Sequence, residues 1–474
     1  MSTLTTALPT RPQGPDQADA GAFADSTPGA FPLLEVAGAQ LHAPLVKGGS
    51  VRYANLDYAA STPAAQTVAD YLTQILPYYA SVHRGAGFTS QVSTSVYENA
   101  RTTVRNFVGG RPDDAVIFTR NTTDSLNLLA GCLSGHAGDV VYLDIEHHAN
   151  LLPWQRLPHR SVVARDSLAE TLRVLEAELS HGNVTLLAVS GASNITGEIL
   201  PVKELAALAH RYGARIVVDA AQLAPHRRIN IAADDIDYLA FSGHKLYAPF
   251  GTGVLVGRVD WLDAGEPHLA GGGAVREARL ETVSWASSPA RHEAGSPNVL
   301  GAATLARATE VLAGLDHAQW RSHEEALRRC LVAGLERLHG VKVHRLFTDA
   351  QDFPSSGSIG VVNFSVAGYD AGLAAAYLSA EHGVGVRDGK FCAHPLLRRL
   401  GLPSGSLRAS FGIGSRLEDA QRLIEGVATL LESGLGCDYI VDSGRWVPAV
   451  DQREYPEWSP NTPGTAGAAP CSQD

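Results

Sequence analysis

The sequence lacks several features that define specialised classes of protein. It has only five cysteines among 474 residues, widely spaced and without a CxxC pair. This pattern excludes a disulfide scaffold and a zinc site built on paired cysteines. No apolar run approaches the ~18 residues of a membrane span, and the first 30 residues lack the basic and then apolar stretches of a signal peptide. We therefore expect a soluble protein of a reducing compartment, the cytoplasm.

Charged residues are also scarce. They make up 18% of the chain, below the roughly 25% of an average globular protein. The 38 basic and 49 acidic side chains give a net charge of −11. Nucleic acids and anionic membranes are bound through clustered Lys and Arg, so we expect neither as a partner.

The body of the chain alternates short apolar runs with helical periodicity. Residues 140–143, 186–189 and 216–218 are continuous apolar runs of strand length, which is typical of strands buried on both faces of a parallel sheet. Between them, 168–179 and 201–212 have the apolar spacing of helices. Strands that alternate with helices predict an α/β domain with a mostly parallel sheet between layers of helices.

The pattern changes after about residue 299. We expect helices at 300–312, 317–338, 371–382 and 417–431, with a strand at 359–364, and hence a smaller α+β domain. The predicted boundaries are a disordered leader at 1–35, a large domain at 61–298, a small domain at 36–60 and 299–434, and a partly disordered C-terminal extension at 435–474.

The most informative segment is Ser242-Gly243-His244-Lys245, which follows a buried strand and precedes a Gly-rich turn. Taken alone, the position of Lys245 indicates a strand-end lysine whose ammonium group reaches water. However, Asp219 ends the apolar run 216–218, and a carboxylate there is costly unless it meets a cation. Ligands of α/β sheets bind at such strand ends. Together, Asp219 and Lys245 suggest pyridoxal phosphate, with the lysine forming the Schiff base and the aspartate holding the pyridine nitrogen protonated.

Two further segments suit such a site. Residues 120–125 follow a strand-like run and open an apolar helix, so their hydroxyls and backbone N–H groups offer a phosphate pocket, although Thr and Asp are also common N-caps. Residues 146–150 follow the 140–143 strand, and one of their two histidines could stack on an aromatic cofactor. Metal binding is not expected, because no third ligand lies at a suitable spacing.

At this point the sequence resembles the class V aminotransferase family of fold-type I pyridoxal-phosphate enzymes, most closely its cysteine desulfurase and selenocysteine lyase branch. The resemblance runs from about residue 55 to 431. It rests on segments that occur in one order, namely 55–60, 83–85, 146–150 with 153–155, 193–194, 219 with 222, 242–245, 293–298 and 408–410.

The resemblance implies a role for each matching residue. Lys245 would be the Schiff-base lysine and proton shuttle. The other residues implied to hold the cofactor are Asp219 at the ring nitrogen, Gln222 at the ring oxygen, His147 stacked on the ring, Thr122, Thr123, Ser242 and His244 at the phosphate, and Ser296 at the phosphate of a neighbouring subunit. Those implied for the substrate are Arg408 at its carboxylate, Asn194, Arg387, His83 and Arg84. The family likeness thus implies an amino-acid substrate and a homodimer.

Cys392 matches the position at which the desulfurase branch carries its persulfide-forming cysteine. A thiolate there could take the sulfur of a substrate, and nearby Arg387 and Lys390 would favour the thiolate. The alternative is an unreactive small residue, which describes most cysteines. Cys132 and Cys330 lie in apolar helices and are expected to pack, whereas Cys437 and Cys471 lie in the tail.

The expected function is therefore cleavage of the C–S bond of L-cysteine to alanine, with a persulfide on Cys392 and a sulfur-acceptor protein as a further partner. Desulfurases usually carry histidines directly before this cysteine, where the chain has Lys390 and Phe391. This departure leaves open an aminotransferase, a selenocysteine or other C–S lyase, or an epimerase on the same fold. A non-catalytic scaffold is a further alternative, against which Lys245, Asp219 and Arg408 argue.

Overall fold

A seven-stranded sheet forms the centre of the protein, seen in a computed structural model that describes residues 28–83, 85–249, 251–353 and 357–459. The strand order is β4 (Ala115–Thr119), β11 (Gly253–Gly257), β10 (Tyr238–Ser242), β9 (Arg215–Asp219), β7 (Val184–Ser190), β5 (Asp139–Leu143) and β6 (His159–Val162). β11 is antiparallel to both neighbours, and the pairings from β10 to β6 are parallel.

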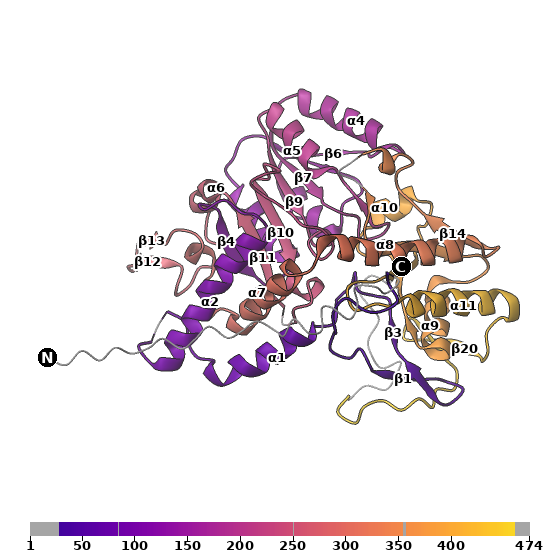
Figure 1. The fold of residues 1–474 in the computed structure, drawn as a ribbon. Helices are drawn as coiled ribbons and strands as arrows, with labels where there is room; N and C mark the ends of the chain where they lie inside the picture. The colour runs from indigo at the N-terminus through magenta and orange to yellow at the C-terminus, as the bar shows by residue number, and fades with distance from the viewer. Residues whose placement is uncertain (1–27, 84, 250, 354–356, 460–474) are drawn as a thin grey trace.

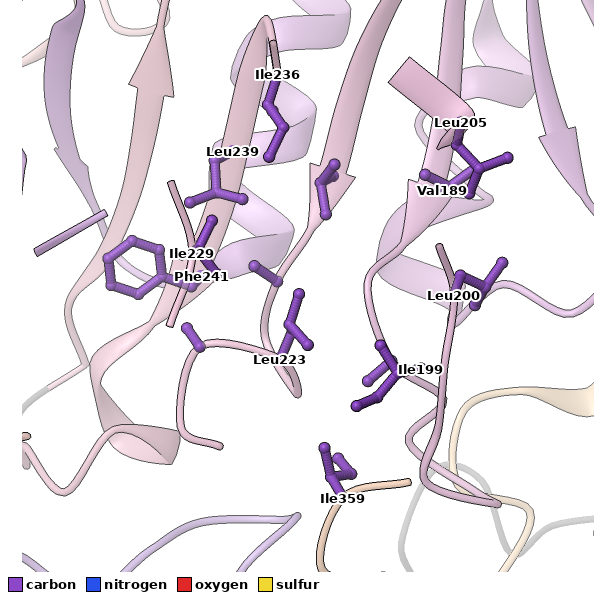
Figure 2. Close-up of a cluster of buried hydrophobic side chains, with 14 of the residues drawn as sticks. Val189, Ile199, Leu200, Leu205, Leu223, Ile229, Ile236, Leu239, Phe241 and Ile359 are labelled. Carbon is purple, nitrogen blue, oxygen red and sulfur yellow. The ribbon is translucent and has the colours of Figure 1, made fainter. Parts of the chain in front are cut away.

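Helices cover both faces of this sheet, because its strands are apolar on both sides. One face packs on α3 (Thr122–Cys132) and α6 (Val259–Ala264). The other packs on α4 (Leu168–Ser180), α5 (Val202–Arg211) and α7 (Val299–Ala313), and α7 in turn contacts α1 (Gln66–Ile75) and α2 (Phe88–Phe107). Figure 2 shows part of the apolar core on this second face, where Val189 of β7 lies near Leu205 of α5, and Phe241 of β10 lies near Ile229.

A second, four-stranded sheet lies in the C-terminal part of the chain. Its strands are β14 (Val341–His344), β16 (Val361–Val366), β19 (Ser406–Ser410) and β18 (Arg387–Gly389), all paired antiparallel. Helices α8 (His317–Glu336), α9 (Ala371–His382) and α11 (Leu417–Ser433) share its apolar core. Figure 1 shows α9 and α11 on the side of the molecule away from α2 and α4. The short helix α10 (His394–Arg399) follows the 390–393 loop.

Short strand pairs join distant segments. They are β1 (His42–Pro44) with β2 (Ser50–Arg52), β3 (Ala54–Asn55) with β17 (Val384–Gly385), β8 (Glu198–Ile199) with β15 (Gly357–Ser358), and β12 (Val275–Ala278) with β13 (Val283–Trp285). The parallel β3–β17 pair is followed by a bridge between Asp57 and Ser410. The 54–57 segment is thereby held beside β19 of the second sheet, at the boundary between the two sheets.

Part of the extension after residue 434 has regular secondary structure. β20 (Tyr439–Asp442) and β21 (Arg445–Pro448) form a hairpin that packs on α9. Residues 460–474 of the predicted extension and 1–27 of the predicted leader lie outside the described residues.

The predicted architecture, a mostly parallel α/β sheet with a smaller α+β unit, is confirmed. The helix expected at 168–179 is α4, that at 300–312 is α7, and that at 417–431 is α11. The strand expected at 359–364 begins two residues later, as β16. The domain boundaries stay a prediction. No helix among the described residues is long and apolar enough to cross a membrane.

Candidate active site

A cavity of about 260 Å³ opens where strands of the large sheet end and the loop after β18 begins. Ligand sites of open α/β sheets form at such strand ends. Twelve of the residues predicted from the sequence line this cavity. They are Thr122, Thr123, His147, Asn194, Asp219, Gln222, Ser242, His244, Lys245, Arg387, Cys392 and Arg408.

The remaining three predicted residues are not part of that lining. His83 lies on the surface before α2, where its Nε2 is 3.0 Å from a carboxylate oxygen of Glu98. Ser296 is exposed in the loop before α7. Arg84 lies outside the described residues. The roles of all three stay predictions.

Lys245 and Asp219 form the electrostatic centre of the cavity. Lys245 ends the short 3-10 turn Gly243–Lys245 that follows β10, and Asp219 is the last residue of the adjacent parallel strand β9. Enclosure by the cavity walls lowers the pKa of Lys245 to about 8, and Asp219 acts in the opposite direction. Burial raises the pKa of Asp219, while Lys245 and a hydrogen bond from the Ala221 N–H lower it. A lysine with a lowered pKa is more often in its nucleophilic, neutral form.

Hydroxyl groups and a helix N-terminus gather at one end of the cavity. Asn121 caps α3 by accepting a hydrogen bond from the Asp124 N–H at 3.0 Å. The first helical residue, Thr122, donates its N–H to Ser242 Oγ at 2.7 Å, and the two hydroxyl oxygens lie 2.6 Å apart. The positive end of the helix dipole and these hydroxyls favour an anion. This end of the cavity is therefore suited to a phosphate group.

His147 is held in one neutral tautomer. Its Nδ1 accepts a hydrogen bond from the Ala149 N–H at 3.0 Å, so that a proton on the ring belongs to Nε2. Burial lowers the pKa of His147 to about 3, and the nearby Lys245 adds to this effect. A neutral imidazole in the cavity wall suits stacking against an aromatic ring.

A buried carboxyl group lies behind His147. Glu146 is fully buried, and its Oε2 accepts hydrogen bonds from Ser190 Oγ at 2.5 Å and Asn150 Nδ2 at 2.7 Å. Trp154 Nε1 donates to Asn150 Oδ1 at 3.0 Å. The second oxygen, Oε1, is buried without a hydrogen-bond partner among the described residues. Burial raises the pKa of Glu146 to about 8, which favours the neutral, protonated carboxyl near neutral pH.

Arg408 supplies a buried guanidinium on the opposite side of the cavity. It lies in β19, with Nη2 2.9 Å from Asp57 Oδ1 and Nη1 donating to the Asn194 carbonyl at 3.0 Å. Its Nε has no partner among the described residues. A guanidinium offers five N–H donors in a planar fork, so donors remain for a carboxylate in the cavity.

Cys392 belongs to the loop between β18 and α10 and lines the same cavity. Its thiol interacts electrostatically with Lys245 and Arg408, and its backbone carbonyl accepts a hydrogen bond from the His148 N–H at 2.8 Å. Two nearby cations favour a thiolate. By contrast, burial in α3 raises the pKa of Cys132 to about 12, as expected for a packing residue.

Three residues of the site were not predicted as functional from the sequence. Asp57 bonds Arg408, Glu146 is buried next to His147 in the sequence, and Phe391 lines the cavity in contact with Arg408. Asp57 and Glu146 both lie inside segments that carry the family resemblance, which is the signal that could have identified them. Among the described residues, no group of His, Cys, Asp or Glu is arranged to hold a metal ion.

Comparison with known proteins gives a consistent family. The family model described as "Aminotransferase class-V" matches residues 54–423. Over 408 residues, the chain is 34% identical to a protein named probable cysteine desulfurase 2 from Mycobacterium leprae, covering 82% of this chain and 94% of that protein. Over 420 residues, it is 34% identical to a cysteine desulfurase from Dickeya dadantii, covering 84% and 94% of the two chains.

Solved structures agree with this family. A cysteine desulfurase from Thermococcus onnurineus superposes with a TM-score of 0.73 at 33% identity, covering 80% of this chain and 95% of the other. A cysteine desulfurase from Escherichia coli, in an S-sulfonic acid form, gives a TM-score of 0.71 at 33% identity and the same coverage.

Proposed function

Because the chain belongs to the class V aminotransferase family, we propose that it is a pyridoxal-phosphate-dependent cysteine desulfurase. It converts L-cysteine to alanine and keeps the sulfur as a persulfide on Cys392. The observation that carries this proposal is the shared cavity, because the thiol of Cys392 lines the same walls as Lys245, Asp219 and Arg408. Relatives that are named cysteine desulfurases and cover 82% and 84% of the chain support the same chemistry.

The donor set of the cavity fits pyridoxal phosphate. The cofactor carries an anionic phosphate at one end and a basic ring nitrogen at another. The N-terminus of α3, with Thr122, Thr123, Ser242 and His244, would hold the phosphate, and Asp219 would hold the ring nitrogen. When bound, the cofactor supplies an electron sink for the carbon atoms of the substrate.

The ring of the cofactor would be held by three further residues of the cavity. His147 would stack on one face as the neutral imidazole described above, and Gln222 would donate to the ring oxygen. The Gln222 amide already donates to the Ala59 carbonyl at 2.8 Å, which fixes its orientation. Lys245 would bind the cofactor covalently and then carry protons at the substrate's α and β carbons, a task for which a pKa near neutrality is suited.

The substrate would be held by its carboxylate. Arg408 would bind that group through the guanidinium N–H donors that Asp57 and the Asn194 carbonyl leave available. Arg387 lies at the exposed side of the cavity and would add a second positive charge. Charge-assisted, two-point bonds of this kind orient as well as attract a carboxylate.

The sulfur step balances within the substrate and one thiol. Cys392 loses its proton to become a thiolate, which the positive charges of Lys245 and Arg408 favour. The thiolate sulfur forms an S–S bond with the sulfur of L-cysteine while the Cβ–S bond of the substrate breaks. The bonding electron pair remains on Cβ, which takes up a proton to give the methyl group of alanine. A dithiol reductant or an acceptor protein then takes the outer sulfur from Cys392.

The proposal includes a cytoplasmic homodimer. Ser296 is exposed in this chain, which suits its implied role at the phosphate of a neighbouring subunit. Persulfide formation needs a reduced thiol, and the cytoplasm maintains this state.

A second candidate keeps the cofactor and changes the reaction. Phe391 replaces the histidine that usually precedes the cysteine, and a phenyl ring can neither take nor give a proton. This observation favours an aminotransferase, another C–S lyase or an epimerase, in which Cys392 has no chemical role. A substrate panel separates these activities, since a transaminase forms a keto acid from the amino acid instead of alanine from cysteine.

The deciding experiment compares Cys392→Ala with Cys330→Ala in the purified, cofactor-loaded chain. We expect Cys392→Ala to reduce alanine formation from L-cysteine about 100-fold or more, because it removes the sulfur acceptor, and to retain the absorbance of the bound cofactor. Cys330→Ala, which removes a thiol in α8 away from the cavity, should behave as wild type. Unchanged turnover in Cys392→Ala would exclude the persulfide mechanism.

A further inference from the structure

Two residues of the 390–393 loop after β18 have a strained backbone. Phe391 and Cys392 have φ angles of 51° and 52°, in the left-handed region that side chains other than glycine rarely adopt. Such a conformation is energetically unfavourable and persists only where surrounding contacts enforce it. The contacts of Phe391 and Cys392 therefore indicate which residues hold the Cys392 thiol in its place in the cavity.

Phe391, Asn194 and Arg408 form a closed set of contacts through both backbone and side-chain atoms. Asn194 Nδ2 donates to the Phe391 carbonyl at 2.9 Å, and Arg408 Nη1 donates to the Asn194 carbonyl at 3.0 Å. The guanidinium carbon of Arg408 lies 5.2 Å from the centroid of the Phe391 ring, within the range of a cation–π contact. The fixed loop thus meets the guanidinium both through the ring and through Asn194.

This set is buried. The exposed fractions of Phe391, Asn194 and Arg408 are 5%, 7% and 3%, so none of the three can move without displacing its neighbours. The next carbonyl along the chain, that of Cys392, is held by the His148 N–H. Both strained residues are therefore held by the segments that follow β5 and β7, through His148 and Asn194, and the first of them also contacts Arg408.

We propose that Phe391 is a positioning residue that couples the presentation of the Cys392 thiol to the arginine at position 408. The inference rests on the proposed function, in which Arg408 binds the substrate carboxylate and Cys392 receives its sulfur. The ring transmits the position of the guanidinium to the backbone of the next residue. Coupling between two groups is reciprocal. A change at Arg408 and a change at Phe391 should therefore alter the surroundings of the Cys392 thiol through the same set of contacts.

The test uses the full-length, cofactor-free chain and measures alkylation of Cys392 by iodoacetamide as a function of pH, with the labelled peptide identified by mass spectrometry. The charged side chains that act on this thiol are Lys245 and Arg408, with Arg387 at the start of β18 and Lys390 on the same loop. In Phe391→Leu the loop should relax away from these cations, so the apparent pKa of the thiol should rise by about half a unit or more. Phe391→Tyr keeps an aromatic face for the guanidinium and should stay close to wild type.

Phe88→Leu is the matched control, because it makes the same substitution at a side chain that is 70% exposed on α2. It should leave the alkylation profile unchanged. An unchanged profile in Phe391→Leu, or an equal shift in Phe391→Tyr and Phe391→Leu, would overturn the role of the ring.

A double-mutant cycle tests the coupling itself. If Phe391 and Arg408 act through one set of contacts, Arg408→Lys combined with Phe391→Leu should shift the profile no further than the larger single change. Shifts that simply add would overturn the coupling. Since this readout needs neither cofactor nor substrate, it can succeed or fail independently of alanine formation from cysteine, which tests the proposed function.

Discussion

The two sides of the cavity are held in place in different ways. Asp219 and Ser242 are the last residues of adjacent parallel strands, and Lys245 ends the short helical turn that follows the second strand. On the other side, Cys392 lies in a loop with a strained backbone, and Arg408 lies in β19 of the second sheet with its side chain held by Asp57 and the Asn194 carbonyl. A sheet positions its backbone through many bonds at once, whereas the Cys392 loop and the Arg408 guanidinium depend on a few individual hydrogen bonds. The first side should therefore tolerate changes in side-chain chemistry without losing its shape, and the second should not.

The largest loss of activity is expected from a change at Asp219. This residue lies on the side of the cavity formed by the ends of β9 and β10, the strand-end side. Asp219→Asn keeps the size of the side chain and the oxygen that accepts from the Ala221 N–H, but it removes the negative charge at the proposed ring nitrogen. We expect alanine formation from L-cysteine to fall about 100-fold or more, in line with the loss of one preorganised electrostatic group. The melting temperature should not fall, because burial already raises the pKa of Asp219 and makes its charge costly to fold.

The control for this change is Asp70→Asn, which removes a charge on the exposed surface of α1 and should alter neither activity nor melting temperature. Activity of Asp219→Asn above a third of wild type would show that the carboxylate is not needed. A large fall in melting temperature would contradict the view that the sheet alone holds this side of the cavity.

The strand-end side was also the part that the sequence could predict. Continuous apolar runs mark buried parallel strands, and polar residues directly after such runs must lie at one edge of the sheet. The predictions for Asp219 and Lys245 needed only that local pattern, and both residues line one cavity. The position of Arg408 came instead from the family resemblance.

The contacts on the other side of the cavity, the loop side that holds Phe391, Cys392 and Arg408, could not be predicted from local sequence patterns. Phe391 meets Asn194 across 197 positions of the sequence, and Asp57 meets Arg408 across 351. No local periodicity encodes such contacts, and neither Phe391 nor Cys392 belongs to a residue type that favours a positive φ. Ser296 illustrates another limit, because its implied role requires a second chain.

A smaller effect, on the KM for L-cysteine, should distinguish Arg408 from Arg387. Arg408→Lys retains a positive charge but cannot keep bonds to Asp57, the Asn194 carbonyl and a substrate carboxylate at once. Loss of one charged hydrogen bond, at about 1.5–3 kcal/mol, should raise the KM for L-cysteine about 10- to 100-fold. Arg387→Lys, at an exposed position, should raise it less than about threefold. Steady-state kinetics of both variants measures the contrast, and equal rises would contradict it.

The smallest effect on activity is expected at Glu146, where the change should be visible in stability instead. Burial raises the pKa of this carboxyl from 4.5 to about 8, so the folded protein holds a proton that the unfolded chain releases. Stability from this group is therefore fully present below about pH 4.5, is lost as the pH rises to about 8, and is constant above that.

Glu146→Gln mimics the protonated acid, because its oxygen can accept from Ser190 and Asn150 while its amide nitrogen takes the place of the unpartnered Oε1. The variant should be close to wild type in unfolding free energy near pH 5 and exceed it increasingly up to pH 8, where the difference should be about 4 kcal/mol. Turnover at pH 7 should change less than about twofold, since the shape of the 146–150 segment is kept. A stability difference that stays constant or shrinks with rising pH would mean that Glu146 is ionised in the fold, and that the strand-end side carries a second negative charge beside Asp219.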